Sequence, residues 1–398
     1  MRLVVKFGGT SLGSGDRIDR AADSIARAVA DGHEVAVVAS AMGSTTDDLL
    51  NEINFEAQPS DKAEIVSMGE RTSVRMLKAA LSTRDIPARF LEPGDPSWPI
   101  ITDEHGEIDA EETRARAGEI ADRLSTEVPV ITGFLAETEA GDVTTLGRGG
   151  SDTTAVMLGN YMEADEVVIV TDVEGVMTGD PRVVEGARNV GQISVDELRN
   201  LSFRGAEVVA PSALTYKAAR LNVRVVHYQQ TDLLTGGTRI EGQFRNLIDL
   251  KEEPVASLTV AGRAIRNQHG VLAKLADVLA SNEINIEGVA SGMDSITFYV
   301  SESNAPRAET VLHDAVVSDE VLSSITLEDG VATIRVTGGE LPNRPGVIKH
   351  IIDPLSDSHI KIHDLITSAT SISVFVDWED GEEALRIIQS VFDDPQTV

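Results

Sequence analysis

Apolar residues in the first part of the chain form short continuous runs, separated by segments with helical periodicity. Such runs are typical of strands buried on both faces of a parallel sheet, where the intervening helices cover both sides. The pattern therefore predicts an α/β domain with a mostly parallel central sheet over residues 1–245. The predicted strands are 2–7, 34–40, 129–132, 166–173 and 223–228, the predicted helices are 14–30, 61–83, 110–124, 152–162 and 206–221, and a hairpin with a Gly-Asp turn is predicted at 136–147.

An internal repeat begins after the polar stretch 241–254. Residues 270–291 align without a gap with the residues from 346 onward, at a constant offset of 76. Each copy has the pattern of a strand, a helix, two strands and a second helix, which fits a ferredoxin-like βαββαβ unit. Two small duplicated units behind a larger α/β domain suggest ligand sensing. The predicted domains are 1–245, 255–330 and 331–398.

The chain is strongly acidic, with 65 Asp and Glu against 34 Lys and Arg and a formal net charge of −31. The acidic residues are scattered along the sequence and are not gathered in one tail. This charge argues against a nucleic-acid partner, because phosphate backbones are bound by basic patches. Salt screens the self-repulsion of such a surface. The composition resembles that of proteins from salt-rich cytoplasm, and an ordinary acidic protein is the alternative.

Several simple features of the sequence restrict the cellular location of the protein and the types of metal site it can contain. The absence of cysteine excludes disulfides and cysteine-ligated metals. No apolar run approaches the roughly 18 residues that a membrane helix needs. The N-terminus leads directly into strand-like sequence, without the basic region and apolar core of a secretory signal. We therefore expect a cytoplasmic protein without a membrane partner.

The first candidate site is KFGGTS at residues 6–11, where an apolar strand leads into two glycines and two hydroxyls. Glycines let backbone N–H groups approach phosphate oxygens, and a following helix offers its positive N-terminus. Lys6 adds a point charge at the end of the strand. The sequence is neither the G-x-x-x-x-G-K-[ST] loop nor a dinucleotide fingerprint. It predicts a phosphate site, although GGTS alone also suits an ordinary strand-to-helix turn.

A second glycine loop, TTLGRGGSDTTA at 144–155, carries Arg148, Ser151 and Asp152. Arg148 can bind a carboxylate through two parallel hydrogen bonds, and the double glycine permits close approach. Ser151 or Asp152 could instead serve only as the N-cap of the next helix. That alternative leaves Arg148 and the glycines unexplained, so the loop predicts a carboxylate site.

Two further segments add polar groups to these loops. Glu70, in SMGERTS at 67–73, lies on an otherwise apolar helix face, and a solvated helix residue is the alternative interpretation. A zwitterionic amino acid needs a cation for its carboxylate and an anion for its ammonium, which Arg148 and Glu70 would supply. The hydroxyls of SAMGSTTDDLL at 40–50 follow a strand, where open α/β sheets bind ligands.

The stretch VTDVEGVMTGDPRVV at 170–184 follows another predicted strand. A loop at the end of a strand suits a nucleotide base and ribose, and Arg182 suits phosphate. The same stretch could equally be an acidic surface loop.

The order and spelling of these segments resemble the aspartate kinases throughout the chain. The resemblance rests on KFGGTS, SAMGSTTDDLL, SMGERTS, ITGF, TTLGRGGSDTTA and TDVEGVMTGDPR, followed by the two ferredoxin-like repeats. It implies the amino-acid kinase fold for the first domain and a pair of ACT domains, the amino-acid sensors of this family, for the repeats. The short spacing between residues 46 and 70 and the segment ITDEHGEI at 101–108 resemble the compact homo-oligomeric members and not those fused to a dehydrogenase.

The same resemblance implies roles for individual residues. Contacts with ATP are implied for Lys6, Phe7, Gly8, Gly9, Ser40, Thr171, Asp172, Met177, Asp180 and Arg182. Contacts with L-aspartate are implied for Thr45, Thr46, Glu70, Phe134, Arg148, Gly149, Gly150, Ser151 and Asp152, and the implied catalytic residues are Lys6, Arg148 and Asp152. A regulatory amino acid, lysine or threonine, is expected at Asn267, Gln268, His269, Gly270, Val271, Leu272, Asn285, Ile286 and Glu287.

Two residues depart from the family pattern. Glu207 stands where the family usually has a lysine that helps to hold nucleotide phosphate, so either Arg204 or Lys217 replaces that lysine or ATP binds differently. Met177 stands where an aromatic residue is common, which weakens the expected base stacking. Neither departure touches the aspartate half of the site.

The combined prediction is a feedback-regulated homo-oligomeric kinase that uses ATP and Mg²⁺ to phosphorylate the side-chain carboxylate of L-aspartate. With a pKa of about 3.9, that carboxylate is ionised at neutral pH and needs no general base. The sequence identifies no protein ligand for Mg²⁺. One alternative is a kinase for another acid such as N-acetylglutamate, and the other is an amino-acid-binding regulatory protein with an inactive kinase domain.

Overall fold

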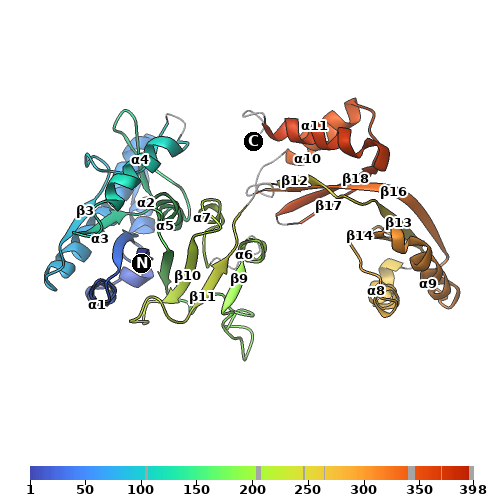
Figure 1. Cartoon of the computed structure of the whole chain (residues 1–398), viewed down its shortest axis with the longest axis horizontal. Coiled ribbons are helices and arrows are strands. Elements are labelled where there is room, and N and C mark those ends of the chain that lie inside the picture. Colours follow the sequence, from blue (N-terminus) through green and yellow to red (C-terminus); the bar gives the residue numbers. More distant parts are fainter. Residues whose placement is uncertain are drawn as a thin grey trace. The chain divides into compact units, whose positions relative to one another are not determined.

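The computed structural model describes residues 1–103, 106–202, 208–244, 247–263, 265–338, 346–368 and 370–393. The chain divides into two compact units, 1–244 and 245–398, each with its own sheet and cores (Figure 1). Among the described residues, no helix combines the length and apolar character needed to cross a membrane.

The first unit is built on an eight-stranded sheet. In spatial order the strands are β3 (Ala88–Leu91), β5 (Val128–Thr132), β2 (Glu34–Ala39), β1 (Arg2–Phe7), β8 (Glu166–Thr171), β10 (Asn222–His227), β11 (Thr238–Glu241) and β9 (Gln192–Ser194). In this order the first six strands run parallel, β11 pairs antiparallel with β10, and β9 completes the edge. This confirms the predicted α/β class with its mostly parallel sheet.

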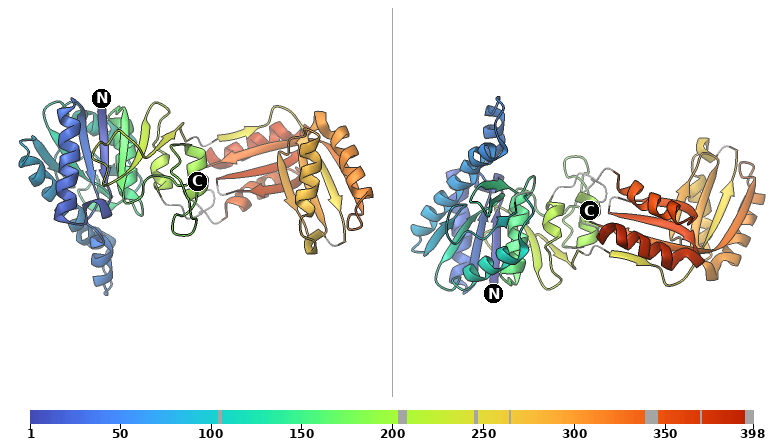
Figure 2. Two further views of the ribbon diagram at one scale, coloured as in Figure 1. Left: turned by 90° about the horizontal axis from the view of Figure 1, so that it is seen from below. Right: turned by 90° about the horizontal axis from the view of Figure 1, so that it is seen from above.

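Helices lie on both faces of this sheet (Figure 2). The helices are α1 (Gly15–Ala30), α2 (Thr45–Glu52), α3 (Pro59–Ser82), α4 (Ala110–Ala121), α5 (Gly150–Tyr161), α6 (Val195–Ser202) and α7 (Pro211–Leu214), and a small sheet contains β4 (Ile101–Thr102), β6 (Leu135–Thr138) and β7 (Val143–Thr145). Successive residues of β1 point to opposite faces, so Val4 belongs to the core under α4 and α5, whereas Leu3 and Val5 belong to the core under α1 and α3. The predicted hairpin is β6–β7.

The predicted helix 206–221 is wrong for the residues that the structure describes. Between residues 208 and 221 only α7 is helical. Proline has no N–H and forces the residue before it out of the helical region, and Ala210, directly before Pro211, is extended with ψ 131°. This break releases the Ala210 N–H for another partner, which is a side chain of the cleft described below.

The second unit contains the two repeats in one seven-stranded sheet. Its strands follow the order β14-β15-β13-β16-β18-β17, with β12 paired to β16. The two repeats have separate cores, one under α8 and α9 and the other under α10 and α11. The elements are β12 (Leu247–Leu250), β13 (Val255–Ala261), α8 (Val271–Ser281), β14 (Gly288–Ser291), β15 (Ser295–Ser301), α9 (Ala305–Val317), β16 (Ser324–Thr337), α10 (Val347–Asp357), β17 (Ile362–Thr367), β18 (Ser371–Asp377) and α11 (Gly381–Asp393).

Backbone conformation repeats with the sequence at the offset of 76. Gly270 and Gly346, which cap α8 and α10, both have positive φ, at 83° and 95°. Glu283 and His359, which follow the two helices, also have positive φ, at 56° and 60°. Non-glycine residues adopt this region rarely, so its recurrence at equivalent positions supports duplication of one ancestral unit.

The second repeat takes its fourth strand from a place that the sequence pattern did not indicate. The stretch 241–254 is polar and the sequence pattern predicts no strand in it, but β12 lies within it and pairs antiparallel with β16. Ile248 and Leu250 of β12 pack against the core under α10 and α11. The expected order of a complete βαββαβ unit in 331–398 is therefore corrected, because only tertiary pairing shows which edge a four-residue strand joins.

Candidate active site

The first glycine loop leaves β1 at the carboxyl end of the parallel sheet. The Gly8 N–H donates to the Val170 carbonyl of β8 at 3.0 Å, and the Gly43 N–H donates to the Gly9 carbonyl at 2.9 Å. A methyl group on Gly9 would lie within 2.9 Å of the Ala41 carbonyl and 2.8 Å of the Gly43 carbonyl. Glycine is therefore required at position 9, where two loops pack backbone against backbone.

Lys6 and Asp152 join the two glycine loops. The Lys6 Nζ lies 2.7 Å from the Asp152 Oδ1, and both side chains are mostly buried. The other oxygen of Asp152 accepts the Ala210 N–H at 3.1 Å. Both Asp152 oxygens thus have a partner, and the carboxylate holds the Lys6 ammonium at the cleft.

The second glycine loop carries Arg148 into α5. Gly147 and Gly149 on either side of it have positive φ, at 72° and 77°, and a methyl group on Gly149 would lie 2.3 Å from the Ala210 Cβ. The Arg148 side chain is exposed, and no ion pair joins it to any residue that the structure describes. The loop therefore presents a free guanidinium at the N-terminus of a helix, which suits an anion.

Glu70 of α3 is a buried carboxylate in the same cleft. It is 3% exposed, and its Oε1 accepts from the Ala41 N–H at 3.3 Å and the Thr46 hydroxyl at 3.4 Å. Its Oε2 is buried without a hydrogen-bond partner among the described residues. Burial raises the pKa of Glu70 to about 7. A buried carboxylate oxygen with open acceptor capacity suits an ammonium group.

These groups line one cleft of about 270 Å³. It brings together most of the residues expected to bind aspartate, together with Lys6, Gly9 and Ser40, which were expected to contact ATP. Sequence reasoning did not single out Ala41, Gly43 and Gly147, which also line it; positive φ at two of them is a backbone signal that only glycine permits. The full lining is Lys6, Gly9, Ser40, Ala41, Gly43, Thr46, Glu70, Phe134, Gly147, Arg148, Gly149, Gly150, Ser151 and Asp152.

The chain is similar to proteins of known family. Residues 1–227 match the amino acid kinase family, and residues 258–316 and 326–390 match ACT domains. An aspartokinase of Mycolicibacterium smegmatis is 31% identical over 98% of this chain and 96% of its own length, and one of Geobacillus stearothermophilus is 32% identical over 98% and 97%. The aspartate kinase structure from Synechocystis has a TM-score of 0.82 at 28% identity and covers 98% of this chain and 69% of its own.

The chain belongs to the aspartokinase family. A structure of E. coli aspartokinase III in complex with aspartate and ADP shares its fold, with a TM-score of 0.54 at 24% identity over 98% of this chain. The sequence resemblance to aspartate kinases and the expected fold, with an amino-acid kinase domain and two ACT domains, are confirmed.

Other residues expected at the nucleotide of an aspartokinase lie at the ends of β1 and β8. The Phe7 side chain is buried in the core, and its carbonyl accepts the Ser40 N–H at 3.1 Å. Thr171 donates to Asp172 at 3.2 Å, directly after β8. None of these three side chains lines the cleft of about 270 Å³.

The 172–191 loop holds the remaining nucleotide candidates. Arg182 makes two hydrogen bonds to Asp180, at 3.0 and 2.9 Å, and this partner lowers the pKa of Asp180. The Arg182 side chain is 88% exposed, so it can exchange this partner for a phosphate. Met177 is half-buried and forms a backbone bridge with Asn189. Their contact with a nucleotide remains a prediction.

Lys217, one of the two residues that could replace the lysine missing at position 207, already has a partner in the protein. Lys217 is 2% exposed, and its ammonium donates to the Gly242 carbonyl. Burial lowers the pKa of Lys217 to about 8. Glu207 and Arg204 lie outside the described residues.

The expected effector residues surround the start of α8 in the second unit. Asn267 ends a 3₁₀ turn, Gly270 caps α8, Val271 is buried and Leu272 is 45% exposed. The Glu287 carboxylate pairs with Lys251, while its N–H donates to the Tyr299 carbonyl at 2.8 Å. Gln268, His269 and Asn285 are exposed, and Ile286 is half-buried.

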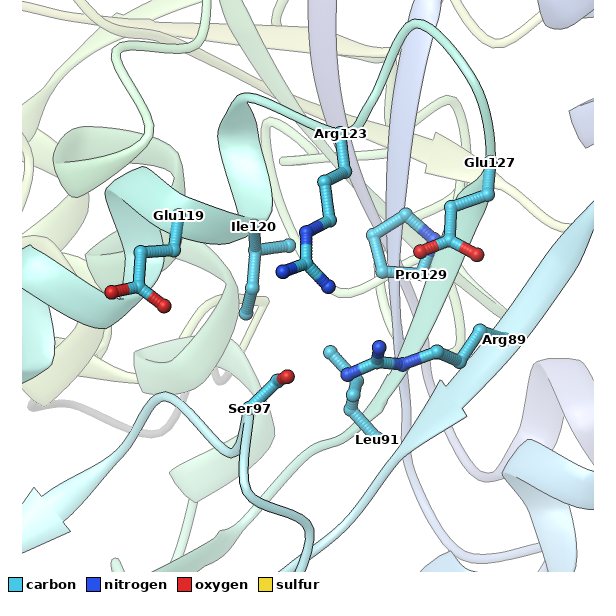
Figure 3. A pocket seen from close by; sticks show the side chains of 8 residues that line it. All are labelled: Arg89, Leu91, Ser97, Glu119, Ile120, Arg123, Glu127 and Pro129. Atoms are coloured by element: carbon cyan, nitrogen blue, oxygen red, sulfur yellow. The ribbon is translucent and has the colours of Figure 1, made fainter.

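Two other features carry no assigned site. A cavity of about 10 Å³, with room for about one water molecule, is lined by charged side chains such as Arg89 and Arg123, and Figure 3 shows these lining residues. In the second unit, Glu328, His363 and Asp377 have the composition of a metal site. Both ring nitrogens of His363 already face these carboxylates, Nδ1 at 3.4 Å from Glu328 and Nε2 at 2.8 Å from Asp377, so each nitrogen has a carboxylate partner within the cluster.

Proposed function

We propose that this chain is an aspartate kinase, which transfers the γ-phosphoryl group of ATP to the side-chain carboxylate of L-aspartate and yields 4-phospho-L-aspartate. The observation that carries the proposal is a single cleft beside the glycine loop of Lys6. In this cleft Glu70 can accept hydrogen bonds from an ammonium group, and Arg148 can donate hydrogen bonds to a carboxylate. The similar aspartokinases match this chain over nearly their whole length.

The proposed mechanism depends on position and charge. Because the acceptor carboxylate is already ionised, the main barrier is repulsion between two anions and the spread of charge in a loose transition state. Lys6 and the N–H groups of the glycine loop stabilise that charge. Asp152 holds the Lys6 ammonium in place and does not serve as a base, since no proton has to be removed.

Mg²⁺ is proposed as the partner of ATP. A magnesium ion bound to a nucleotide is usually held by phosphate oxygens, waters and one or two carboxylates. In the described cleft, the Asp152 oxygens are engaged by Lys6 and Ala210, and Glu70 lies at the aspartate end. We therefore assign most ligands of the ion to ATP, where it would neutralise phosphate charge.

The ACT pair is proposed to provide feedback control by lysine or threonine. A lysine and aspartate complex is reported for E. coli aspartokinase III, a structural neighbour at 23% identity. An effector that prefers one of two states shifts the catalytic equilibrium by its difference in affinity. We further propose domains at 1–245, 255–330 and 331–398, with β12 added to the last, a homo-oligomer formed through the ACT domains, and a cytoplasmic location.

Trapping of the acyl phosphate with hydroxylamine tests the reaction. The assay contains ATP, Mg²⁺ and either L-aspartate, L-glutamate or N-acetyl-L-glutamate, at low and molar KCl, with lysine or threonine in parallel. Hydroxamate from L-aspartate alone supports the proposal. Hydroxamate from N-acetyl-L-glutamate alone would assign a different acceptor, and no product from any acid at any salt would favour an amino-acid sensor with an inactive kinase domain.

A further inference from the structure

A side chain with no role so far lies against the phosphate loop. Arg17, in the first turn of α1, donates through Nη1 to the Thr10 carbonyl in the 3₁₀ turn after the double glycine. A methyl group on Gly13 would lie 3.7 Å from the same nitrogen. The guanidinium therefore contacts the backbone of the loop on the side where α1 begins.

The other side of the guanidinium contacts the end of a sheet strand. Its carbon lies 4.5 Å from the centre of the Tyr228 ring, and Nη2 is 3.5 Å from the Tyr228 hydroxyl. Tyr228 directly follows β10, packs against the core and donates its N–H to the Thr171 carbonyl at 2.8 Å. Arg17 thus connects the phosphate loop with the segment that carries Thr171, another nucleotide candidate.

Arg17 forms no ion pair with any residue that the structure describes, although acidic residues outnumber basic ones by 65 to 34. Its positive charge beside the glycine loop is therefore not neutralised by a carboxylate of the described chain. By contrast, the Lys6 ammonium is paired with Asp152.

We propose that Arg17 is a positioning residue for the nucleotide: it fixes the loop of residues 8–13 to the end of β10, so that the loop N–H groups are already arranged for the phosphates. This inference rests on the proposed function in placing ATP phosphates at the loop. Only arginine can donate to the Thr10 carbonyl and stack its plane on Tyr228 together. Lysine keeps the charge but loses this planar, two-sided contact.

Arg17→Lys separates positioning from simple charge. Isothermal titration of the full chain with MgADP measures nucleotide affinity without requiring any acceptor acid. Arg20→Lys, on the exposed face of the same helix, is the matched control. Tyr228→Leu removes the ring from the other side, and the melting temperature of each variant shows whether it is folded.

We expect Arg17→Lys and Tyr228→Leu each to weaken MgADP binding about tenfold, the double variant to be no weaker than about tenfold, and Arg20→Lys to bind like the parent chain. The KM for the acceptor acid should change less than twofold. Unchanged MgADP affinity in Arg17→Lys overturns the inference, as does an equal loss of affinity for nucleotide and acceptor acid. If Arg17→Lys does not fold, the same criteria apply to Tyr228→Leu.

The same titration separates this inference from the proposed reaction. If the parent chain binds MgADP but produces no hydroxamate with L-aspartate, the assignment of L-aspartate as the acceptor is wrong. The role of Arg17 is then still tested by the MgADP affinities of the variants. A parent chain that binds no MgADP overturns both.

Discussion

Glu70 and Arg148, the two charged groups proposed to bind aspartate, lie in different environments. Glu70 is buried with one oxygen open, whereas Arg148 is exposed on a loop between two glycines of positive φ. Burying an ionised carboxylate costs free energy unless a cation pairs with it. The position of Glu70 in the free protein therefore already favours an ammonium group as its partner. The exposed guanidinium can adjust to the incoming carboxylate because nothing in the described cleft holds it.

The raised pKa of Glu70 predicts how aspartate binding changes with pH. Burial favours the neutral carboxyl, so below about pH 7 the free protein holds Glu70 protonated and offers no charge to the ammonium. As pH rises through about 7, Glu70 ionises, and the KM for aspartate should fall. Initial rates against aspartate concentration between pH 6 and 8 measure this change.

Glu70→Gln keeps the size of the side chain and removes its charge. We expect the KM for aspartate to rise by roughly 10- to 100-fold at pH 8, as for the loss of a hydrogen bond to a charged group, and its dependence on pH near 7 to disappear. Glu64→Gln, at a mostly exposed position of the same helix, is the control and should retain the parent profile. A Glu70→Gln variant with the parent pH profile would show that another group titrates.

Lys6 and Arg148 should affect different kinetic constants. Lys6→Met removes charge from the phosphate loop, so kcat should fall by about 10²- to 10³-fold, the effect typical of losing one group that stabilises transition-state charge. Arg148→Ala should mainly raise the KM for aspartate. Steady-state kinetics with both substrates varied, and Lys62→Met as a surface control, distinguish the two roles. Near-normal turnover in Lys6→Met would contradict its phosphate role.

At the scale of elements, the short strand β12, which precedes the first repeat in sequence, belongs to the core of the second repeat. β12 has only four residues, yet it pairs with β16 and places Ile248 and Leu250 on the core under α10 and α11. A methyl group on Gly381, the first residue of α11, would lie 3.3 Å from Leu250. The second repeat therefore depends on residues that precede the first repeat in sequence.

Leu250→Ala tests this dependence on β12. Removing the half-buried side chain should destabilise the second repeat by about 1–2 kcal/mol, less than the 2–5 kcal/mol of a fully buried leucine. Hydrogen exchange of peptides from β16 and β18 reports the local free energy of opening. Leu247→Ala, 47% exposed on the same strand, is the control and should leave exchange unchanged. Equal effects of the two substitutions would contradict a specific packing role.

At the scale of the whole molecule, the charge of −31 acts on every unit at once. Described cations do pair with carboxylates, but several of these ion pairs, such as Lys349–Asp353, are largely exposed and contribute little. The net repulsion therefore opposes the compact state at low ionic strength. Salt adaptation itself remains a prediction from composition.

The melting temperature should rise with KCl concentration. Screening relieves self-repulsion, and each kcal/mol gained raises the melting temperature by about 2–4 °C for a unit of this size. Thermal unfolding from 0.05 to 2 M KCl measures the effect, with sorbitol at equal osmolality as a control that does not screen charge. If the melting temperature stops rising well below 1 M KCl, charge screening alone explains the effect. A melting temperature that stays constant or falls with KCl would contradict the prediction.

The sequence by itself determined what depends on neighbouring residues. Continuous apolar runs specify buried parallel strands, and the offset of 76 specifies duplication; both are confirmed. The glycines at 8–9 and 149–150 indicated the two loops, because close backbone approach and positive φ leave a local signature.

Only the tertiary structure decided what depends on residues distant in sequence. The burial of Glu70, the pairing of Lys6 with Asp152 and the contact of Arg17 with Tyr228 each join residues from separate elements. The sequence pattern predicted a continuous helix at 206–221, but the structure breaks before Pro211 and the Ala210 N–H donates to Asp152. Periodicity reports which face of an element is apolar, but the partner of a charged group and the edge joined by a short strand are set by the packing of the whole chain.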